Sequence, residues 1–320
     1  MDVGWFDFEE WENREIKRSN LDIETHEESL NSNNKNFDYD IISVFTSSNV
    51  SREVLDSIRP DAVLTRSTGY DHIDIDAASD LDIEVFNVPS YGCNAVAEQA
   101  ISLLLTISRK IPEALEQSHQ KFSHEGLEGF ELDGKKFGVV GTGDIGQKAI
   151  KMANGFEMDV IAYDPYGNDD LEQKLGFMYV SKKDLLEKSD IISLHIPLTK
   201  DTEHFLDSSE FAKMEDTVII NTARGGVINS KALLEALKDG SVKAAGLDVL
   251  ELEDEIDCLE NYNDKTNFCR PGHKANCELI EREDTYITPH NAFNTSEAKK
   301  EILKQTIENI KLRKEESRVV

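Results

Sequence analysis

Positive charge is scarce in this sequence of 320 residues, which holds 35 Lys and Arg against 63 Asp and Glu, for a formal net charge of −28. Nucleic acids and anionic membranes are bound through basic surfaces, because phosphate groups attract cations. The composition therefore disfavours both classes of partner. An anionic substrate would depend on local cations, so any buried Arg is of interest. A salt-rich cytoplasm is an open alternative explanation of the acidity.

The sequence also lacks a recognisable secretory signal. Its first residues, from Met1 to Glu10, contain neither a basic segment nor an apolar core. The longest apolar-rich stretch, from Ala95 to Ile107, is interrupted by polar residues and is too short to cross a bilayer. We therefore predict a cytoplasmic protein.

Cysteine is rare, and without a secretory signal we do not expect disulfides. Three of the four cysteines lie with a histidine in one polar stretch, as Cys258, Cys269, His273 and Cys277. The close Cys-x2-Cys pairs typical of structural zinc are missing. Unpaired thiols in a long surface loop are the favoured interpretation, a zinc site is the alternative left open, and we predict no metal cofactor.

Length and pattern predict an α/β protein of about two domains. Hydrophobic residues make up 39% of the chain and charged residues 31%, which is enough apolar surface for a sizeable core. Short apolar runs alternate with helical patterns, as in doubly wound parallel sheets with helices on their faces. We expect strands at residues 40–46, 61–65, 82–88, 137–141, 158–163, 190–195, 217–221, 243–247 and 284–288, and helices that include 52–58, 96–117 and 296–313.

A glycine-rich turn, Gly141-Thr-Gly143-Asp-Ile-Gly146, stands between an apolar run and a helical pattern. Such a turn lets a pyrophosphate approach the backbone, and the N–H groups at the helix start face the anion. The next apolar run ends in Asp164, 21 residues after Gly143. A carboxylate there binds ribose hydroxyls and repels a 2′-phosphate, which favours NAD over NADP. An ordinary strand–turn–helix is the alternative.

Three further residues together suit a redox reaction of a keto acid. Arg224 follows an apolar strand, and its planar guanidinium could bind a carboxylate, although a surface ion pair is the alternative. His290 ends a short strand, and a nearby carboxylate would raise its pKa toward useful acid catalysis. Glu253 by itself does not indicate a catalytic role, because the chain has 63 acidic residues. With a nicotinamide as hydride source, the three predict reduction of a 2-keto acid.

These segments, in this order, resemble the D-2-hydroxyacid dehydrogenase family over nearly the whole chain from about residue 40. The resemblance implies a Rossmann NAD-binding domain, residues 94–293, inserted into a flavodoxin-like substrate domain made of residues 1–93 and 294–320. It implies an active site in the cleft between the domains, whose closure excludes water, and a homodimer. The segments that carry it are residues 65–74, 88–98, the glycine turn, 194–199, 222–226, 247–249 and 288–290.

The same resemblance implies roles for individual residues. Arg224 would orient the substrate, His290 would be the acid/base, and Glu253 would be the partner of His290. Substrate contacts are implied for Thr68, Gly69, Tyr91 and Phe293. Cofactor contacts are implied for Gly141, Gly143, Asp144, Ile145, Gly146, Asp164, Ile196, Pro197, Thr202, Thr222, Ala223 and Asp248.

The aromatic residues Tyr91 and Phe293 resemble pocket positions of the D-lactate dehydrogenase-like subgroup. Two aromatic walls suit a small apolar substrate group better than a phosphate, so we expect a pyruvate-like keto acid and a D-lactate-like product. Plain core packing of the two aromatics, a hydroxypyruvate, glycerate or longer-chain substrate, and an NAD-sensing corepressor stay open. The long loop before His290 departs from the family, which leaves Glu251 as an alternative to Glu253.

Overall fold

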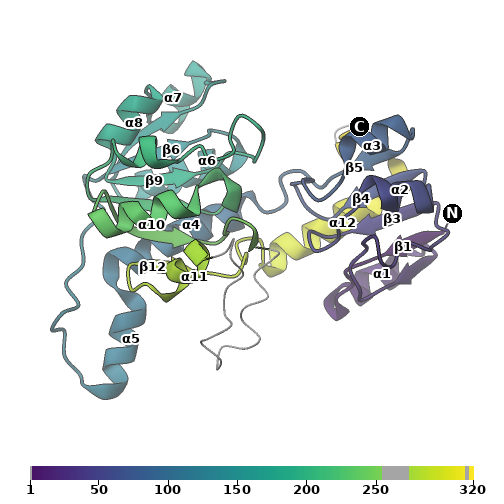
Figure 1. Ribbon diagram of the computed structural model, residues 1–320, viewed down its shortest axis with the longest axis horizontal. Helices are drawn as coiled ribbons and strands as arrows, with labels where there is room; N and C mark the ends of the chain where they lie inside the picture. Colours follow the sequence, from purple (N-terminus) through teal and green to yellow (C-terminus); the bar gives the residue numbers. More distant parts are fainter. Residues whose placement is uncertain (1, 254–273, 314–316) are drawn as a thin grey trace. The chain divides into compact units, whose positions relative to one another are not determined.

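The structure is a computed structural model that describes residues 2–253, 274–313 and 317–320. By its internal contacts the chain forms two units, Met1–Tyr91 with Asn294–Val320, and Gly92–Phe293 (Figure 1). These junctions lie at or within two residues of the limits drawn from the sequence. No helix in the described ranges combines the length and the apolar composition of a membrane span.

The first unit is a parallel sheet with the order β2-β1-β3-β4-β5, the flavodoxin-like order. Helices α2 and α3 pack on one face, and α1 and α12 on the other. Its strands are β1 (Val3–Trp5), β2 (Ile23–Thr25), β3 (Ile41–Val44), β4 (Ala62–Thr65) and β5 (Glu84–Phe86). Its helices are η1 (Glu10–Glu12), α1 (Asn13–Ser19), α2 (Arg52–Ile58), α3 (Ile75–Asp80) and α12 (Ser296–Leu312).

The second unit is a parallel sheet with the order β12-β11-β10-β9-β6-β7-β8. This is the Rossmann order with one further strand, and it reverses between β6 and β9, where such sheets bind ligands. Its strands are β6 (Lys136–Val140), β7 (Asp159–Tyr163), β8 (Met178–Tyr179), β9 (Ile191–Leu194), β10 (Thr217–Asn221), β11 (Val242–Leu247) and β12 (Thr285–Ile287). Its helices are α4 (Cys93–Arg109), α5 (Ile111–Gln120), α6 (Asp144–Gly155), α7 (Asp169–Leu175), α8 (Lys182–Lys188), α9 (Ser208–Phe211), η2 (Gly225–Val227), α10 (Ser230–Asp239) and α11 (Lys274–Glu281).

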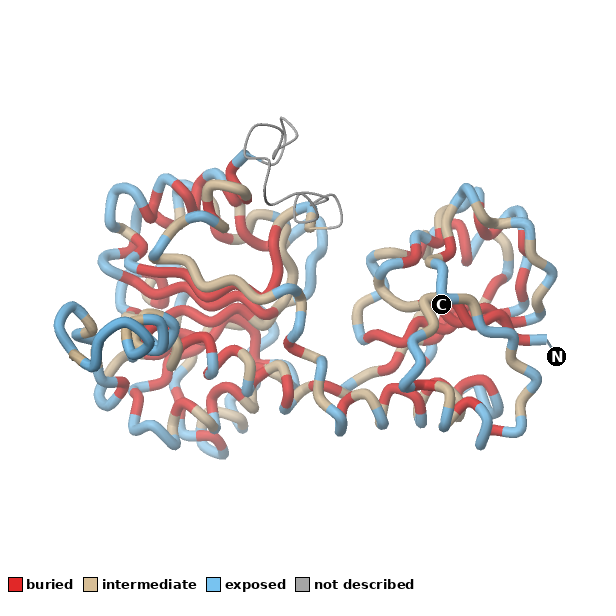
Figure 2. The backbone as a smooth tube through the Cα atoms, turned by 90° about the horizontal axis from the view of Figure 1, so that it is seen from below, coloured by how far each residue is buried: buried red, intermediate tan, exposed pale blue. Residues whose placement is uncertain are grey.

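Each sheet forms the middle layer of its unit, with buried strands between helices that are exposed on their outer sides (Figure 2). In the second unit α4 and α6 cover one face, and α8, α10 and α11 cover the other. Residues of β10 alternate between the two cores: Val218 and Ile220 face α4 and α6, whereas Ile219 faces α10. A parallel strand covered on both faces is apolar throughout, and this is the pattern that the sequence showed. The predicted fold class is confirmed.

Two expectations about the elements were wrong or incomplete. The helix expected over 96–117 is two helices, because Lys110 takes the left-handed conformation (φ 49°) between α4 and α5. Pro112 follows, and a continuous helix would bring its ring against the carbonyl of Ser108 and leave that carbonyl without its N–H. Strands β1, β2 and β8, of two or three residues each, were not predicted.

Candidate active site

The glycine turn lies between β6 and α6, where the strand order reverses. Gly141 has a φ of 89°, and a Cβ there would lie 2.5 Å from the carbonyl oxygen of His195. A Cβ on Gly146 would lie 2.0 Å from the carbonyl oxygen of Gly141. Gly143 differs, because within the described parts of the chain a Cβ there would meet no atom within 4 Å. Backbone packing therefore requires two glycines, and the third leaves the turn open in front of α6, as an incoming pyrophosphate requires.

Asp164, directly after β7, is held at this turn by hydrogen bonds. Its Oδ2 accepts from the backbone N (2.8 Å) and the Oγ1 (2.9 Å) of Thr142, and its Oδ1 accepts from the N of Tyr166 (2.9 Å). The hydroxyl of Tyr179 lies 2.7 Å from Thr142 Oγ1. The single hydroxyl hydrogen of Thr142 is donated to Asp164, so in the second hydrogen bond Tyr179 is the donor and Thr142 the acceptor. The carboxylate is thus placed beside the turn, where the ribose of a dinucleotide is bound in this fold.

Further predicted cofactor residues follow β9 and β10 at the same end of the sheet. Thr222 is 6% exposed, and its Oγ1 has no hydrogen-bond partner among the residues that the structure describes. A buried hydroxyl without a partner is unfavourable, so this atom is suited to bind a ligand. The other predicted contacts here are Ile196, Pro197, Thr202 and Ala223. The open turn, the placed Asp164 and the unsatisfied Thr222 together fit NAD.

His290 and Glu253 are 37 residues apart in the sequence and form an ion pair in the structure, from His290 Nδ1 to Glu253 Oε1. The second carboxylate oxygen of Glu253 accepts the N–H of Leu250 (3.0 Å). Burial lowers the pKa of His290, but the hydrogen bond and the charge of Glu253 outweigh that effect, so the pKa of His290 is raised. The bond at Nδ1 orients the ring and leaves Nε2 to exchange a proton with a substrate.

The turn that carries His290 is held by Asp248, which is 1% exposed. Its Oδ1 accepts from Thr288 Oγ1 (2.5 Å) and the N of Asn291 (2.9 Å), and its Oδ2 from the N of Ala292 (2.8 Å). Its backbone oxygen accepts from the N of His290 (2.8 Å). The carboxylate thus binds backbone N–H groups of the turn, and the role expected for Asp248 at the cofactor stays a prediction.

Arg224 lies three residues after the end of β10. The positive charge of Arg224 acts to lower the pKa of His290. The Asn221 side chain donates to the Arg224 backbone oxygen (2.9 Å) and so fixes the start of the loop. A Cβ on Gly225 would lie 1.9 Å from the carbonyl oxygen of Leu250, so this loop touches the turn that carries Glu253. The loop that carries Arg224 therefore packs against the turn that carries Glu253, and Glu253 is bonded to His290.

The open choice between two glutamates is decided by their partners. Glu251 Oε1 lies 2.6 Å from Nε2 of His204, whereas Glu253 is bonded to His290. In this structure Glu253 is therefore the carboxylate that acts on His290. His204 was missed by sequence reasoning, because nothing local links it to residue 251.

The remaining predicted substrate residues divide between the units. Thr68 and Tyr91 lie in the first unit, where Thr68 Oγ1 donates to the backbone oxygen of Val88 (3.0 Å). Gly69 follows Thr68 on the same loop, and Phe293 is the last residue of the second unit. These placements do not test their predicted contacts with a substrate.

Sequence reasoning also missed Arg66, which precedes the Thr68 loop and is 1% exposed. Its guanidinium pairs with Glu12 (3.2 Å), donates to the backbone oxygen of Phe6 (2.6 Å) and stacks on Trp5. Burial raises the pKa of Glu12 although the charge of Arg66 opposes this. The sequence did offer a signal for a buried cation here, because Arg66 directly follows an apolar strand in a strongly acidic protein. Arg66 anchors the base of the loop.

The cysteine expectations have a mixed outcome. Cys277 in α11 takes part in a disulfide, so the expectation of unpaired thiols is wrong at this position. Cys258, Cys269 and His273 lie outside the described residues. Over the ranges that the structure covers, no group of three or more His, Cys, Asp or Glu side chains could hold a metal ion.

Comparison with known proteins identifies the family. Residues 101–292 match the family model described as D-isomer specific 2-hydroxyacid dehydrogenase, NAD binding domain. The chain is 36% identical over 274 residues to the D-lactate dehydrogenase of Escherichia coli, and the aligned region covers 84% of this chain and 82% of that protein. It is 35% identical over 274 residues to the hydroxypyruvate reductase of Thermotoga maritima, with coverage of 85% and 83%.

A solved structure supports the same assignment. The crystal structure of D-lactate dehydrogenase from Aquifex aeolicus, complexed with NAD and lactic acid, superposes with a TM-score of 0.84 at 30% identity, covering 97% of this chain and 94% of that one. The agreement extends over both parallel sheets, and the matched family model covers the glycine turn, Arg224, Glu253 and His290. The protein thus belongs to the D-isomer-specific 2-hydroxyacid dehydrogenases, NAD-dependent oxidoreductases.

Proposed function

We propose that this enzyme reduces a small 2-keto acid of the pyruvate type to the D-2-hydroxy acid with NADH, and catalyses the reverse reaction. The observation that carries the proposal is the His290–Glu253 pair, together with the Arg224 loop that packs against the turn of Glu253. This arrangement supplies a proton donor whose pKa is raised and a cation for a carboxylate. A 2-keto acid has the carbonyl and the carboxylate that these two groups would bind.

The proposed chemistry divides the work among the residues. Bound NADH supplies the hydride that the carbonyl carbon receives. Arg224 binds the substrate carboxylate through its planar guanidinium. Protonated His290 donates the proton on Nε2 to the carbonyl oxygen, which becomes the hydroxyl, and Glu253 stabilises the charged imidazole before the transfer. In the reverse direction neutral His290 accepts the hydroxyl proton. Hydride and proton together account for the two hydrogens added to the keto acid.

The finer proposal concerns the substrate. Similarity to D-lactate dehydrogenases supports pyruvate and D-lactate, and the aromatic residues Tyr91 and Phe293 favour a small apolar group. Hydroxypyruvate is the second candidate, because the identity to a hydroxypyruvate reductase is nearly as high. Contacts of Thr68 and Gly69 with the substrate carboxylate, and a cytoplasmic location, are kept as proposals from the sequence.

Oxidation of NADH with a panel of 2-keto acids tests this function. We expect the highest kcat/KM for pyruvate among pyruvate, hydroxypyruvate, 2-ketobutyrate and phenylpyruvate. With NADPH we expect at least a roughly tenfold lower kcat/KM, because Asp164 repels the 2′-phosphate by about 1.4 kcal/mol or more. No turnover with any member would overturn the activity, whereas preference for hydroxypyruvate would select the second candidate. Preference for NADPH would contradict the role of Asp164.

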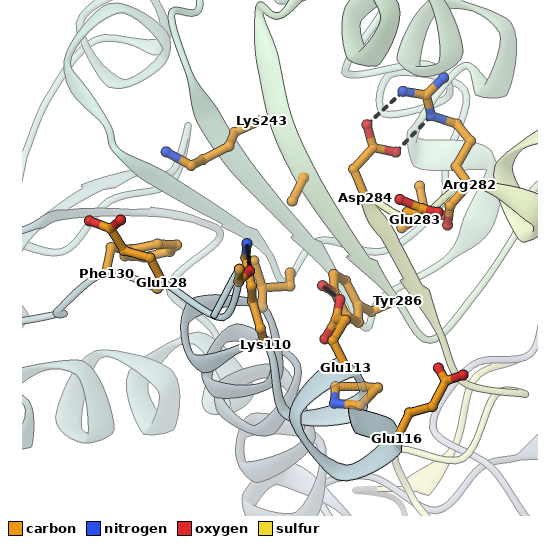
Figure 3. A pocket seen from close by; sticks show the side chains of 16 residues that line it. Lys110, Glu113, Glu116, Glu128, Phe130, Lys243, Arg282, Glu283, Asp284 and Tyr286 are labelled. Carbon is orange, nitrogen blue, oxygen red and sulfur yellow. Dashed lines mark hydrogen bonds and ion pairs between the residues drawn. The ribbon is translucent and has the colours of Figure 1, made fainter. Parts of the chain in front are cut away.

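We also propose a homodimer formed through the region of α5. This helix has no buried residue, and Leu115 and Phe122 are 61% and 102% exposed. Beside α5 lies an open groove of about 1440 Å³. Figure 3 shows Tyr286 directed at Glu113, and the Tyr286 hydroxyl donates a hydrogen bond that joins β12 to α5. Exposed apolar side chains such as Leu115 and Phe122 fit contact with a second copy of the chain.

Sedimentation velocity checks the dimer. The wild-type protein is expected to sediment at twice the monomer mass of 36.1 kDa, and the double variant L115S/F122S is expected to sediment as a monomer, because it removes the apolar side chains from the proposed contact. Tyr166→Ser, which removes an aromatic residue that is 91% exposed elsewhere on the second unit, is the control and stays dimeric. A wild-type monomer would refute the proposal.

A further inference from the structure

Glu251 stands two residues before Glu253 and has three fixed contacts of its own. Its Oε1 lies 2.6 Å from His204 Nε2, and its Oε2 accepts the N–H of Ser230 (3.1 Å). Its backbone oxygen accepts from Asn276 Nδ2 (2.5 Å). These partners come from the loop after β9, from the start of α10 and from α11. The turn after β11 is therefore fastened to three separate elements immediately before it presents Glu253.

The backbone between the two glutamates is unusual. Leu252 has a φ of 55°, a left-handed conformation that is unfavourable for a branched side chain. Its side chain is 54% exposed, so burial does not compensate. The glutamates on either side of Leu252 bind two different histidines: Glu251 binds His204, and Glu253 binds His290.

His204 also contacts the loop that carries Arg224. Its backbone N donates to the Gly226 oxygen (2.8 Å), while its ring binds Glu251. Gly225 packs against the Leu250 carbonyl so closely that no Cβ fits. One histidine is thus bonded both to the Arg224 loop and to the turn that holds Glu253.

We propose that His204 and Glu251 are positioning residues that keep the Glu253 carboxylate in hydrogen-bonding range of His290. The inference rests on the proposed function for its effect on turnover, but its structural part does not. The charged groups that act on His290 are Glu253, Arg224 and Asp248. Glu253 raises the pKa of His290, whereas burial and Arg224 lower it. If the turn is released, the effect of Glu253 weakens, so the pKa of His290 falls.

The test is an NMR titration of the His290 ring in the full-length protein with NAD bound, assigned by the signal that His290→Gln removes. Glu251→Ala and His204→Ala are each expected to lower the His290 pKa by about one unit, the size of one nearby charge effect. The kcat/KM for pyruvate near neutral pH is expected to fall about tenfold, while the KM for NADH is unchanged. The amide of His204→Gln can donate to Glu251. This variant is therefore expected to recover most of the His290 pKa and most of the kcat/KM that His204→Ala loses.

Glu235→Ala is the matched control, because it removes one carboxylate from the same unit at an exposed position that pairs with Lys238. It is expected to leave the His290 pKa unchanged. A merely structural role would lower the melting temperature of the His204 and Glu251 variants without moving the His290 pKa, and that result would overturn the inference. If the wild-type protein reduces no keto acid but the pKa still falls in both variants, the positioning stands and the proposed function fails.

Discussion

Replacing His290 with Ala is expected to lower kcat for pyruvate reduction by about 100- to 10,000-fold, the range that positioned acid–base groups contribute. The variant keeps the glycine turn and Asp164, so the Kd for NADH is expected to stay near the wild-type value. Steady-state kinetics and a fluorescence titration of NADH measure the two quantities. His119→Ala, at an exposed position in α5, is the matched control. Turnover retained in the His290 variant would refute its role as the proton donor.

The pH profile tests the same assignment independently. Reduction needs the protonated imidazole, so kcat/KM falls as the pH rises through the His290 pKa. Burial lowers this pKa, but Glu253 more than offsets the effect, which places the descending limb above the ordinary value of about 6.5. Glu253→Gln removes the charge and leaves burial and Arg224 to lower the pKa, so the limb is expected to move to lower pH. A limb that stays in place would show that Glu253 does not act on His290.

Replacing Arg224 with Lys is expected to lower kcat/KM for pyruvate by about 10- to 100-fold, chiefly through a higher KM. An ammonium group cannot form the two parallel hydrogen bonds that a guanidinium makes to a carboxylate, and bonds to charged groups contribute about 1.5–3 kcal/mol each. Arg224→Gln also removes the charge, so its loss is expected to be larger. Kinetics with pyruvate over a wide concentration range separate KM from kcat.

A substrate without a carboxylate sharpens the Arg224 experiment. Acetaldehyde offers a carbonyl for reduction but nothing for the guanidinium to bind, so its weak turnover is expected to change little in Arg224→Lys. Arg109→Lys, at an exposed position at the end of α4, controls for the exchange of cations. An unchanged KM for pyruvate in Arg224→Lys would show that Arg224 does not bind the substrate.

Local pattern was sufficient for the fold class, the family and the cofactor. Apolar runs such as Val218–Ile220 show a fully buried parallel strand directly, because every residue faces one of two cores. The glycine turn and Asp164 are readable because their spacing reflects backbone geometry within one β–α–β unit. The break at Lys110 was missed although Pro112 marked it, and the short strands β1, β2 and β8 were missed as well.

The chemistry of the site depends on contacts that no local pattern encodes. The sequence alone established a dinucleotide turn, an acidic residue beside it and a set of candidate polar side chains at strand ends. Only the tertiary structure decided that Glu253 and not Glu251 meets His290, that Asp248 binds the N–H groups of the His290 turn, and that His204 is bonded to residue 251. The reason is physical: these partners are 37 to 47 residues apart in the sequence, so they meet only when distant segments of the second unit pack together.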